Sequence, residues 1–112
     1  MVAIGNPEIE IEGVSGGLFT LQIEIKNTGD VDATDVNWNL TIDGGLLAPS
    51  SRKTSESGIL IKSSDSVIVV SKLISGIGKI RILIRANASG ANEVSKKVDA
   101  LLLFFYIIID YN

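Results

Sequence analysis

The chain has 112 residues, and among them there is no cysteine and no histidine. Without cysteine the protein has no disulfide framework and no thiolate nucleophile, and its composition fits a reducing and an oxidising compartment equally well. Without histidine it lacks the commonest general base and the commonest metal ligand. Catalysis by this chain would have to use carboxylate, lysine, tyrosine or serine side chains, and we expect neither an enzymatic activity nor a cofactor.

An excess of charge of one sign is also missing, because 13 acidic and 10 basic residues give a net charge of −3. Such a surface has no positive field for a polyanion, so we expect no nucleic-acid partner. One Trp, two Tyr and three Phe are too few for a platform on which bases or sugars would stack. The longest apolar run, 100–109, is about half the ~20 residues of a membrane-spanning helix, and no transmembrane span is expected.

What the chain does have is alternation of apolar and polar residues. In the segment 35–42 the apolar positions are Val36, Trp38, Leu40 and Ile42, and polar residues lie between them. The segments 19–26 and 79–86 alternate in the same way, and 8–12 begins a shorter example. A period of two predicts strands that bury one face.

Turn-forming residues separate these segments at 16–17, 27–30, 43–45, 76–78 and 87–92. The polar stretch 50–57 is expected to be a loop, and further strands are expected at 59–61 and 67–73. Seven or eight short strands at this spacing predict one all-β domain over 1–112, an antiparallel β-sandwich with Trp38 between its two sheets.

The segment 94–105 leaves an alternative open. Its apolar residues also follow helical spacing, with Asn92 available as an N-cap. The branched side chains of Ile107, Ile108 and Ile109, which continue the run, favour a pleated sheet. We therefore predict a strand, with the run 101–109 as an apolar C-terminal strand.

Several of the turns form a familiar set, and their residues are Lys26-Asn27-Thr28-Gly29-Asp30, Ala33-Thr34, Val36, Trp38 and Asp43-Gly44-Gly45, together with Gly16-Gly17 and Gly76-x-Gly78-Lys79-Ile80. Over roughly residues 7–100 this pattern resembles the CARDB-like family of immunoglobulin-like, adhesion-related modules of bacterial and archaeal surface proteins. In physical terms, Asn27 can bond its own backbone two residues on, Gly29 can adopt a positive φ, and Ala33 is small enough for the point where the chain crosses between sheets.

The resemblance implies a non-catalytic spacer, stalk or adhesive unit at the cell surface. Families of this kind share no catalytic residues that could be transferred to this chain. The segment 1–7 has neither the basic patch nor the apolar stretch of a signal peptide, so either the protein stays inside the cell or the chain is a module of a longer exported protein. The resemblance implies the second, and we expect an extracellular or cell-surface module. The alternative is a carbohydrate- or protein-binding accessory domain, which would need a concave or aromatic surface.

Two polar features are weak candidates for sites. Asp30, Asp32 and Asp35 could offer carboxylate oxygens to calcium, although the full pattern of a calcium loop is missing. Asn87 begins an Asn-Ala-Ser sequon in an expected loop and is a candidate for glycosylation, whereas the sequon at Asn39 lies in mid-strand.

Charged residues on one strand suggest structural pairing. Lys79, Arg81 and Arg85 share a face, and we expect cross-strand partners such as Asp35 or Glu24. The adjacent pairs at 71–72 and 95–96 combine Ser with Lys, but neighbours on a strand point to opposite faces, so neither pair is a credible catalytic dyad.

The run Leu101–Ile109 contains no polar interruption apart from the tyrosine hydroxyl, so a strand there presents apolar side chains on both faces. One face can pack in the core, and the other needs a cover. We expect self-association, or contact with a neighbouring domain, through this strand. Its interaction residues are predicted to be Leu103, Phe104, Phe105, Tyr106 and Ile107.

Overall fold

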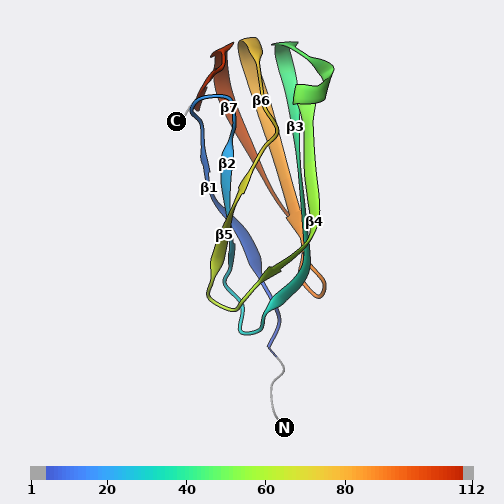
Figure 1. Cartoon of the computed structure of the whole chain (residues 1–112). Helices are drawn as coiled ribbons and strands as arrows, with labels where there is room; N and C mark the ends of the chain where they lie inside the picture. Colours follow the sequence, from blue (N-terminus) through green and yellow to red (C-terminus); the bar gives the residue numbers. More distant parts are fainter. Residues whose placement is uncertain (1–4, 110–112) are drawn as a thin grey trace.

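Two antiparallel sheets make up the computed structural model, which describes residues 5–109 (Figure 1). The strands are β1 (Ile9–Ser15), β2 (Gln22–Asn27), β3 (Ala33–Leu47), β4 (Lys53–Ile61), β5 (Ser66–Val70), β6 (Gly76–Asn87), β7 (Val94–Phe104) and β8 (Tyr106–Ile109), with a short 3-10 helix, η1 (Pro49–Arg52), before β4. One sheet has the order β1-β2-β5 and the other has the order β4-β3-β6-β7-β8. The predicted all-β sandwich is confirmed, and the helical alternative at 94–105 is wrong because that segment is β7.

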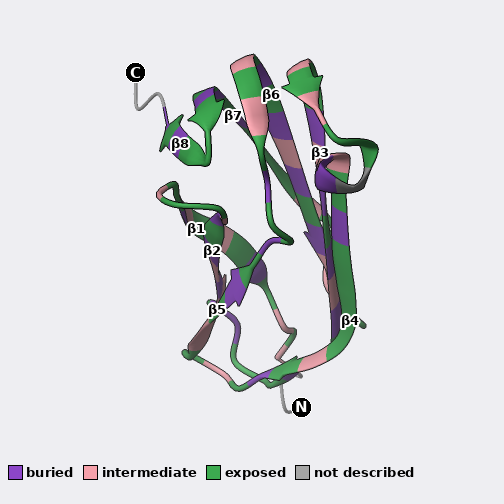
Figure 2. Ribbon diagram, turned by 45° about the horizontal axis from the view of Figure 1, so that its top comes forward, coloured by how far each residue is buried: buried purple, intermediate pink, exposed green. Residues whose placement is uncertain are grey.

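The core lies between the two sheets and follows the alternation of the sequence (Figure 2). Each central strand buries every second residue, which gives a core that includes Leu21, Ile23, Ile25, Trp38, Leu40, Ile42, Ile82, Ile84 and Leu102. Full burial of one such side chain contributes about 1.5–3 kcal/mol. Trp38 lies in this core as predicted, and its indole Nε1 is a buried donor without a partner among the described residues.

Strand limits differ from the prediction where polar residues pair at an edge. The segment 50–57, expected as a loop, forms η1 and most of β4, which is the edge strand beside β3. Only Thr54 and Ile61 of β4 are buried, so the sequence there is mostly polar although the backbone pairs with β3 over much of the strand. Polar residues are common on edge strands because they discourage pairing with other chains.

The glycine pair 44–45 was expected to end its strand, but β3 continues through it as a bulge and reaches Leu47. Gly44 and Gly45 have φ of 83° and 64°, values that favour glycine. The guanidinium of Arg52, at the end of η1, donates to the carbonyl oxygens of Ile42 and Gly44 at 3.1 Å and of Gly45 at 3.2 Å. One side chain thereby satisfies three carbonyls at the bulge.

The Asn27 side chain joins the two sheets near the end where β2 finishes. Its Nδ2 donates to the carbonyl of Val31 at 2.8 Å and to that of Ile61 at 3.0 Å, and its Oδ1 accepts from the amide of Gly29 at 2.9 Å. Asn27 is fully buried. The predicted bond to the backbone two residues on is therefore confirmed, and the same carboxamide also reaches β4 in the opposite sheet.

Glycine is required at position 29 because the neighbouring backbone leaves no room for a side chain, and not because the position has a positive φ. Its φ lies outside the positive region, contrary to expectation, but a Cβ at this position would overlap the backbone of residues 6–8. Four residues further on, Ala33 is fully buried at the start of β3, where the chain has crossed to the second sheet. The predicted role of a small residue at this crossing is confirmed.

Buried hydroxyl groups hold the last of the three crossings between the sheets, from β5 to β6. Ser71 Oγ accepts from the amide of Leu21 at 2.9 Å and donates to the carbonyl of Lys72 at 2.8 Å. Thr54 Oγ1 accepts from the amide of Lys72 at 3.1 Å, and Ser51 Oγ donates to the carbonyl of Leu73 at 3.3 Å. The β2–β3 and β5–β6 crossings between the sheets are therefore both fastened by short polar side chains.

We predict that Asn27→Ala lowers the free energy of unfolding by about 2–4 kcal/mol, because it leaves several buried backbone groups without partners. Asn39→Ala is the matched control, because Asn39 is exposed on β3, and its effect should be within about 0.5 kcal/mol. Urea unfolding followed by the fluorescence of Trp38, the single tryptophan, measures both. Equal losses in the two variants would contradict the assigned role.

Candidate functional site

The three aspartates considered as calcium ligands do not come together as a metal site. Asp30, Asp32 and Asp35 are all exposed, and Asp32 Oδ1 accepts a hydrogen bond from the amide of Ser63 at 2.9 Å. Within residues 5–109, no group of three or more acidic side chains is placed to hold a metal ion. The region therefore acts as a turn that is fastened to the β4–β5 connection.

Asn87 is the last residue of β6 and not part of a loop, which corrects the expected position of this glycosylation candidate. It lies opposite Asn37 in the sheet, is half-buried, and accepts a hydrogen bond from Asn37 Nδ2 at 3.2 Å. Asn39 lies in mid-strand as expected. Glycosylation of Asn87 stays a prediction.

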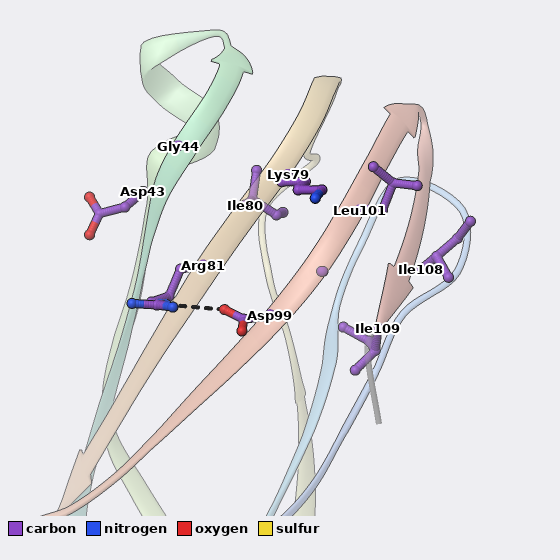
Figure 3. Close-up of a pocket in the computed structure, with 10 residues that line it drawn as sticks. Asp43, Gly44, Lys79, Ile80, Arg81, Asp99, Leu101, Ile108 and Ile109 are labelled. Atoms are coloured by element: carbon purple, nitrogen blue, oxygen red, sulfur yellow. Dashed lines mark hydrogen bonds and ion pairs between the residues drawn. The ribbon is translucent and has the colours of Figure 1, made fainter. Parts of the chain in front are cut away.

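The basic residues of β6 share the outer face of the five-stranded sheet, but their predicted partners are wrong. Glu24 belongs to the other sheet, and Asp35 lies before the part of β3 that pairs with β6. Arg81 Nε instead forms an ion pair with Asp99 Oδ1 of β7 at 3.0 Å (Figure 3). Both side chains are about 60% exposed (63% and 60%), and exposed pairs contribute only ~0–1 kcal/mol.

An open hollow of about 830 Å³ lies on this sheet, next to the ion pair. The charged side chains of Asp43, Arg81 and Asp99 line one side, and Leu101 and Ile108 line the other (Figure 3). The hollow therefore joins a row of charges of both signs to an apolar surface. This composition suits contact with another surface of mixed character.

The run 101–109 forms a hairpin and not the single strand that was expected. β7 ends at Phe104, Phe105 lies in the turn, and β8 returns antiparallel so that Leu103 pairs with Tyr106. The reason is that one strand would expose half of its apolar side chains, whereas the hairpin brings Ile107 and Ile109 onto the core. A turn within an apolar run has no polar or glycine signal in the sequence.

Four of the five predicted interaction residues are exposed at this hairpin. Leu103, Phe104, Phe105 and Tyr106 are between 43% and 66% exposed. Ile107 is only 3% exposed, because it points from β8 into the core, and its predicted role in an interaction is wrong. The alternation of β8 separates Tyr106 and Ile108, which face outwards, from Ile107 and Ile109.

The pairing of distant strands adds exposed apolar residues that sequence reasoning missed. Leu46 of β3 lies opposite Ile77 of β6, which lies opposite Leu103 of β7, and Leu103 in turn lies opposite Tyr106. Leu101 and Ile108 form the next pair along β7 and β8. Directly opposed residues share a face of a sheet. We call these six exposed residues the outer apolar face: Leu46, Ile77, Leu101, Leu103, Tyr106 and Ile108.

A second group of exposed residues, the aromatic tip, consists of Phe19, Phe104 and Phe105 at the same end of the sandwich. The rings of Phe19 and Phe105 are 5.0 Å apart, and the amide of Phe19 donates to the carbonyl of Phe105 at 2.7 Å. Phe19 was expected on the buried face of a strand, but β2 begins only at Gln22. Its φ of 70° and that of Phe104, 58°, are unusual for bulky residues.

The segment around Phe19 also covers the free edge of β8. The amide of Ile107 donates to the carbonyl of Gly17 at 2.8 Å, and Leu18 forms a bridge to Tyr106. A Cβ on Gly16 would overlap the carbonyl oxygen of Ile107, so the close approach requires glycine there. The β1–β2 connection thereby occupies the edge at which another strand could otherwise pair.

Comparison of the chain with models of protein families and with curated proteins finds no match. Over the described residues, no helix has the length and apolar character that crossing a membrane requires.

We predict that Phe104→Gly is more stable than Phe105→Gly by about 1–2 kcal/mol, because only Phe104 has a positive φ that glycine adopts without strain. Both variants remove an exposed phenyl ring and add the same flexibility to the unfolded chain, so each is the control for the other. Thermal unfolding measured by circular dichroism gives the difference. If Phe105→Gly were the more stable of the two, the turn would not be strained at Phe104.

Proposed function

We propose that this chain is a non-catalytic structural or adhesive module whose apolar end makes contact with protein. The observation that carries this proposal is the exposure of the outer apolar face and of the aromatic tip at the same end of the sandwich. Apolar side chains that are left in water contribute nothing to folding, whereas their burial by a partner is favourable. An exposed surface of this kind therefore suits recognition better than it suits stability.

The size of the exposed surface supports contact with a macromolecule. With the exposed fractions of its six residues, the outer apolar face presents roughly 600 Å², at the upper limit of the ~300–600 Å² that the largest apolar patch of a monomer reaches. The aromatic tip extends this surface around the end of the molecule. Patches of this size mark interaction sites, and the bordering charges of Arg81 and Asp99 would supply the polar rim.

The arrangement of the strands supports an immunoglobulin-like assignment within the sandwich class. With β1 to β7 in chain order as strands A to G, one sheet contains A, B and E, and the other contains C, F and G, as in immunoglobulin domains. The fourth strand joins the second sheet here, and β8 is an addition beyond strand G. Together with the Asn27–Asp30 turn, this order supports a CARDB-like module of an exported, cell-surface protein.

The shape of the sandwich suits a spacer or stalk. Its extents are 56 × 27 × 18 Å, and the strands run along the long direction (Figure 1). β1 begins near one end of this axis, and the β7–β8 hairpin lies at the other (Figure 1). A load along the chain would act on long β-ladders between β3, β6 and β7, which share many hydrogen bonds.

We predict that Leu103→Ser changes the free energy of unfolding by less than about 1 kcal/mol, because Leu103 belongs to the contact surface and not to the core. Leu102→Ser is the matched control, since Leu102 is the adjacent, fully buried residue of β7 and should cost about 3–4 kcal/mol. Urea unfolding measures both variants at a low protein concentration, at which self-association contributes least. Under the same conditions, binding of the dye ANS to the folded protein should fall in Leu103→Ser.

Two results would contradict the contact surface. Leu103→Ser could prove as destabilising as Leu102→Ser, which would assign the exposed residues to the fold. Alternatively, ANS binding could remain unchanged when Leu103 and Tyr106 are both replaced by Ser, which would show that these residues form no accessible apolar surface.

A further inference from the structure

We infer that the outer apolar face binds a second copy of this chain, sheet against sheet, about a two-fold axis that runs along the strands between β6 and β7. This inference rests on the proposed contact function and adds to it the identity of the partner and the geometry of the contact. It is carried by the register of the five-stranded sheet, by the pattern of charge on it, and by the area that is exposed.

The outer face of the sheet is built in rows across the strands. The end row contains Leu46, Ile77, Leu103 and Tyr106, and the second contains Lys79, Leu101 and Ile108. The third row contains Asp43, Arg81 and Asp99, on β3, β6 and β7 respectively. The face therefore changes from apolar to charged along the strands: the end row is apolar, the second row combines Lys79 with two apolar residues, and the third row contains charges of both signs.

A two-fold axis along the strands places each row against the same row of the second copy. Because the rotation exchanges the two sides of the axis, β6 of one copy lies over β7 of the other. Ile77 then meets Leu103 of the second copy, and Leu46, on β3, meets Tyr106, on β8. In the third row, Arg81 meets Asp99 of the second copy, and the reciprocal pair forms by symmetry.

The charges are self-complementary in this arrangement. Arg81 and Asp99 are paired within one chain, but both remain more than half exposed, so each has donor or acceptor capacity for a second partner. Two such pairs brought together by the axis form a ring of four alternating charges. In the second row, Lys79 of each copy lies over Leu101 of the other and not over the other Lys79, so the complementary charges are those of the third row.

The exposed area also fits a second copy. A standard interface buries about 800 Å² on each partner, and the outer apolar face supplies roughly 600 Å² of this. The charged row beside it supplies the remainder as a rim. Aligned packing of two sheets, with apolar side chains interdigitating between them, is a common way to bury such a face.

Association through the edge of β8, the strand that carries part of the outer apolar face, is disfavoured. The edge of β8 is occupied by the β1–β2 connection, whose Gly17 and Phe19 take part in hydrogen bonds to Ile107 and Phe105. A second copy could not add a strand there without breaking these bonds. The outer face, in contrast, has no covering segment among the described residues, and its side chains are exposed.

Sedimentation velocity of the intact chain, alone and as charge variants, tests the inference. The unaltered chain should form a dimer, and Arg81→Glu and Asp99→Lys should each weaken it at least about tenfold, because each places like charges across the axis. An equimolar mixture of the two variants should recover dimers with a dissociation constant within a few-fold of the original. Only a contact between Arg81 of one copy and Asp99 of the other predicts this recovery.

Apolar variants complete the experiment. Leu103→Glu should abolish the dimer, whereas Ile68→Glu should leave it unchanged, because Ile68 is equally apolar and 64% exposed but belongs to β5 of the other sheet. Circular dichroism verifies that each variant is folded, and Leu103→Ser supplies a neutral replacement should the charged one fail to fold.

The outcomes separate the inference from the function on which it rests. A monomeric intact chain at ~1 mM protein, well above the dissociation constant of a standard interface, would overturn the inference. A dimer that is insensitive to Leu103→Glu, or charge variants whose mixture does not recover, would overturn it as well. In each case a stability-neutral Leu103→Ser that lowers ANS binding would still support a contact surface for a different protein.

Discussion

The buried carboxamide of Asn27 is the interaction on which the two-layer arrangement depends. It lies at the end of β2, closes the turn toward β3 through Gly29 and Val31, and reaches Ile61 of β4 in the opposite sheet. A buried amide that finds partners on all sides holds segments in one relative position, because any shift leaves a polar group unpaired. The aliphatic core supplies most of the favourable free energy, but many packings of aliphatic side chains are nearly equivalent, and Asn27 selects among them.

The opposite end of the sandwich, at the β7–β8 turn, is apolar, and the unfavourable backbone conformation of Phe104 there has a structural explanation. Phe104 adopts a positive φ because a two-residue turn between Leu103 and Tyr106 is the shortest way to fold the apolar run back onto the core. The energy of burying Ile107 and Ile109 exceeds the roughly 1–2 kcal/mol of an unfavourable backbone conformation. The turn nonetheless leaves Phe104 and Phe105 exposed. Glycine would suit this backbone better, so the presence of phenylalanine agrees with the proposed role of the aromatic tip in a contact outside the fold.

Sequence reasoning succeeded where one residue and its neighbours determine the structure. The alternation around Trp38 predicted a half-buried strand, and Asn27 predicted its own turn, because both signals are local. The prediction from sequence failed where residues far apart in the chain determine whether a segment forms a strand. The polar segment 50–57 becomes a strand because β3 offers it an edge, and β3 passes through Gly44–Gly45 because Arg52 satisfies the carbonyls of the bulge. The outer apolar face was likewise predicted only in part. The apolar run 101–109 was evident in the sequence, whereas Leu46 and Ile77 lie beside it only because β3, β6 and β7 pair in this register.

The direction of the proposed axis has a consequence for how such modules would be presented. A two-fold axis along the strands keeps both copies parallel, so the two ends held by Asn27 lie side by side and the two aromatic tips point the same way. Chains that are anchored to one surface through the same end can meet in this way without bending, whereas an antiparallel pair would bring together chains from opposing surfaces. The direction of the axis therefore distinguishes a stalk, whose copies are anchored to one surface, from an adhesive unit that joins two opposing surfaces. Parallel pairing would stiffen a stalk by doubling its cross-section, and it would leave the aromatic tips of both copies together at the exposed end, as a joint surface for a further contact.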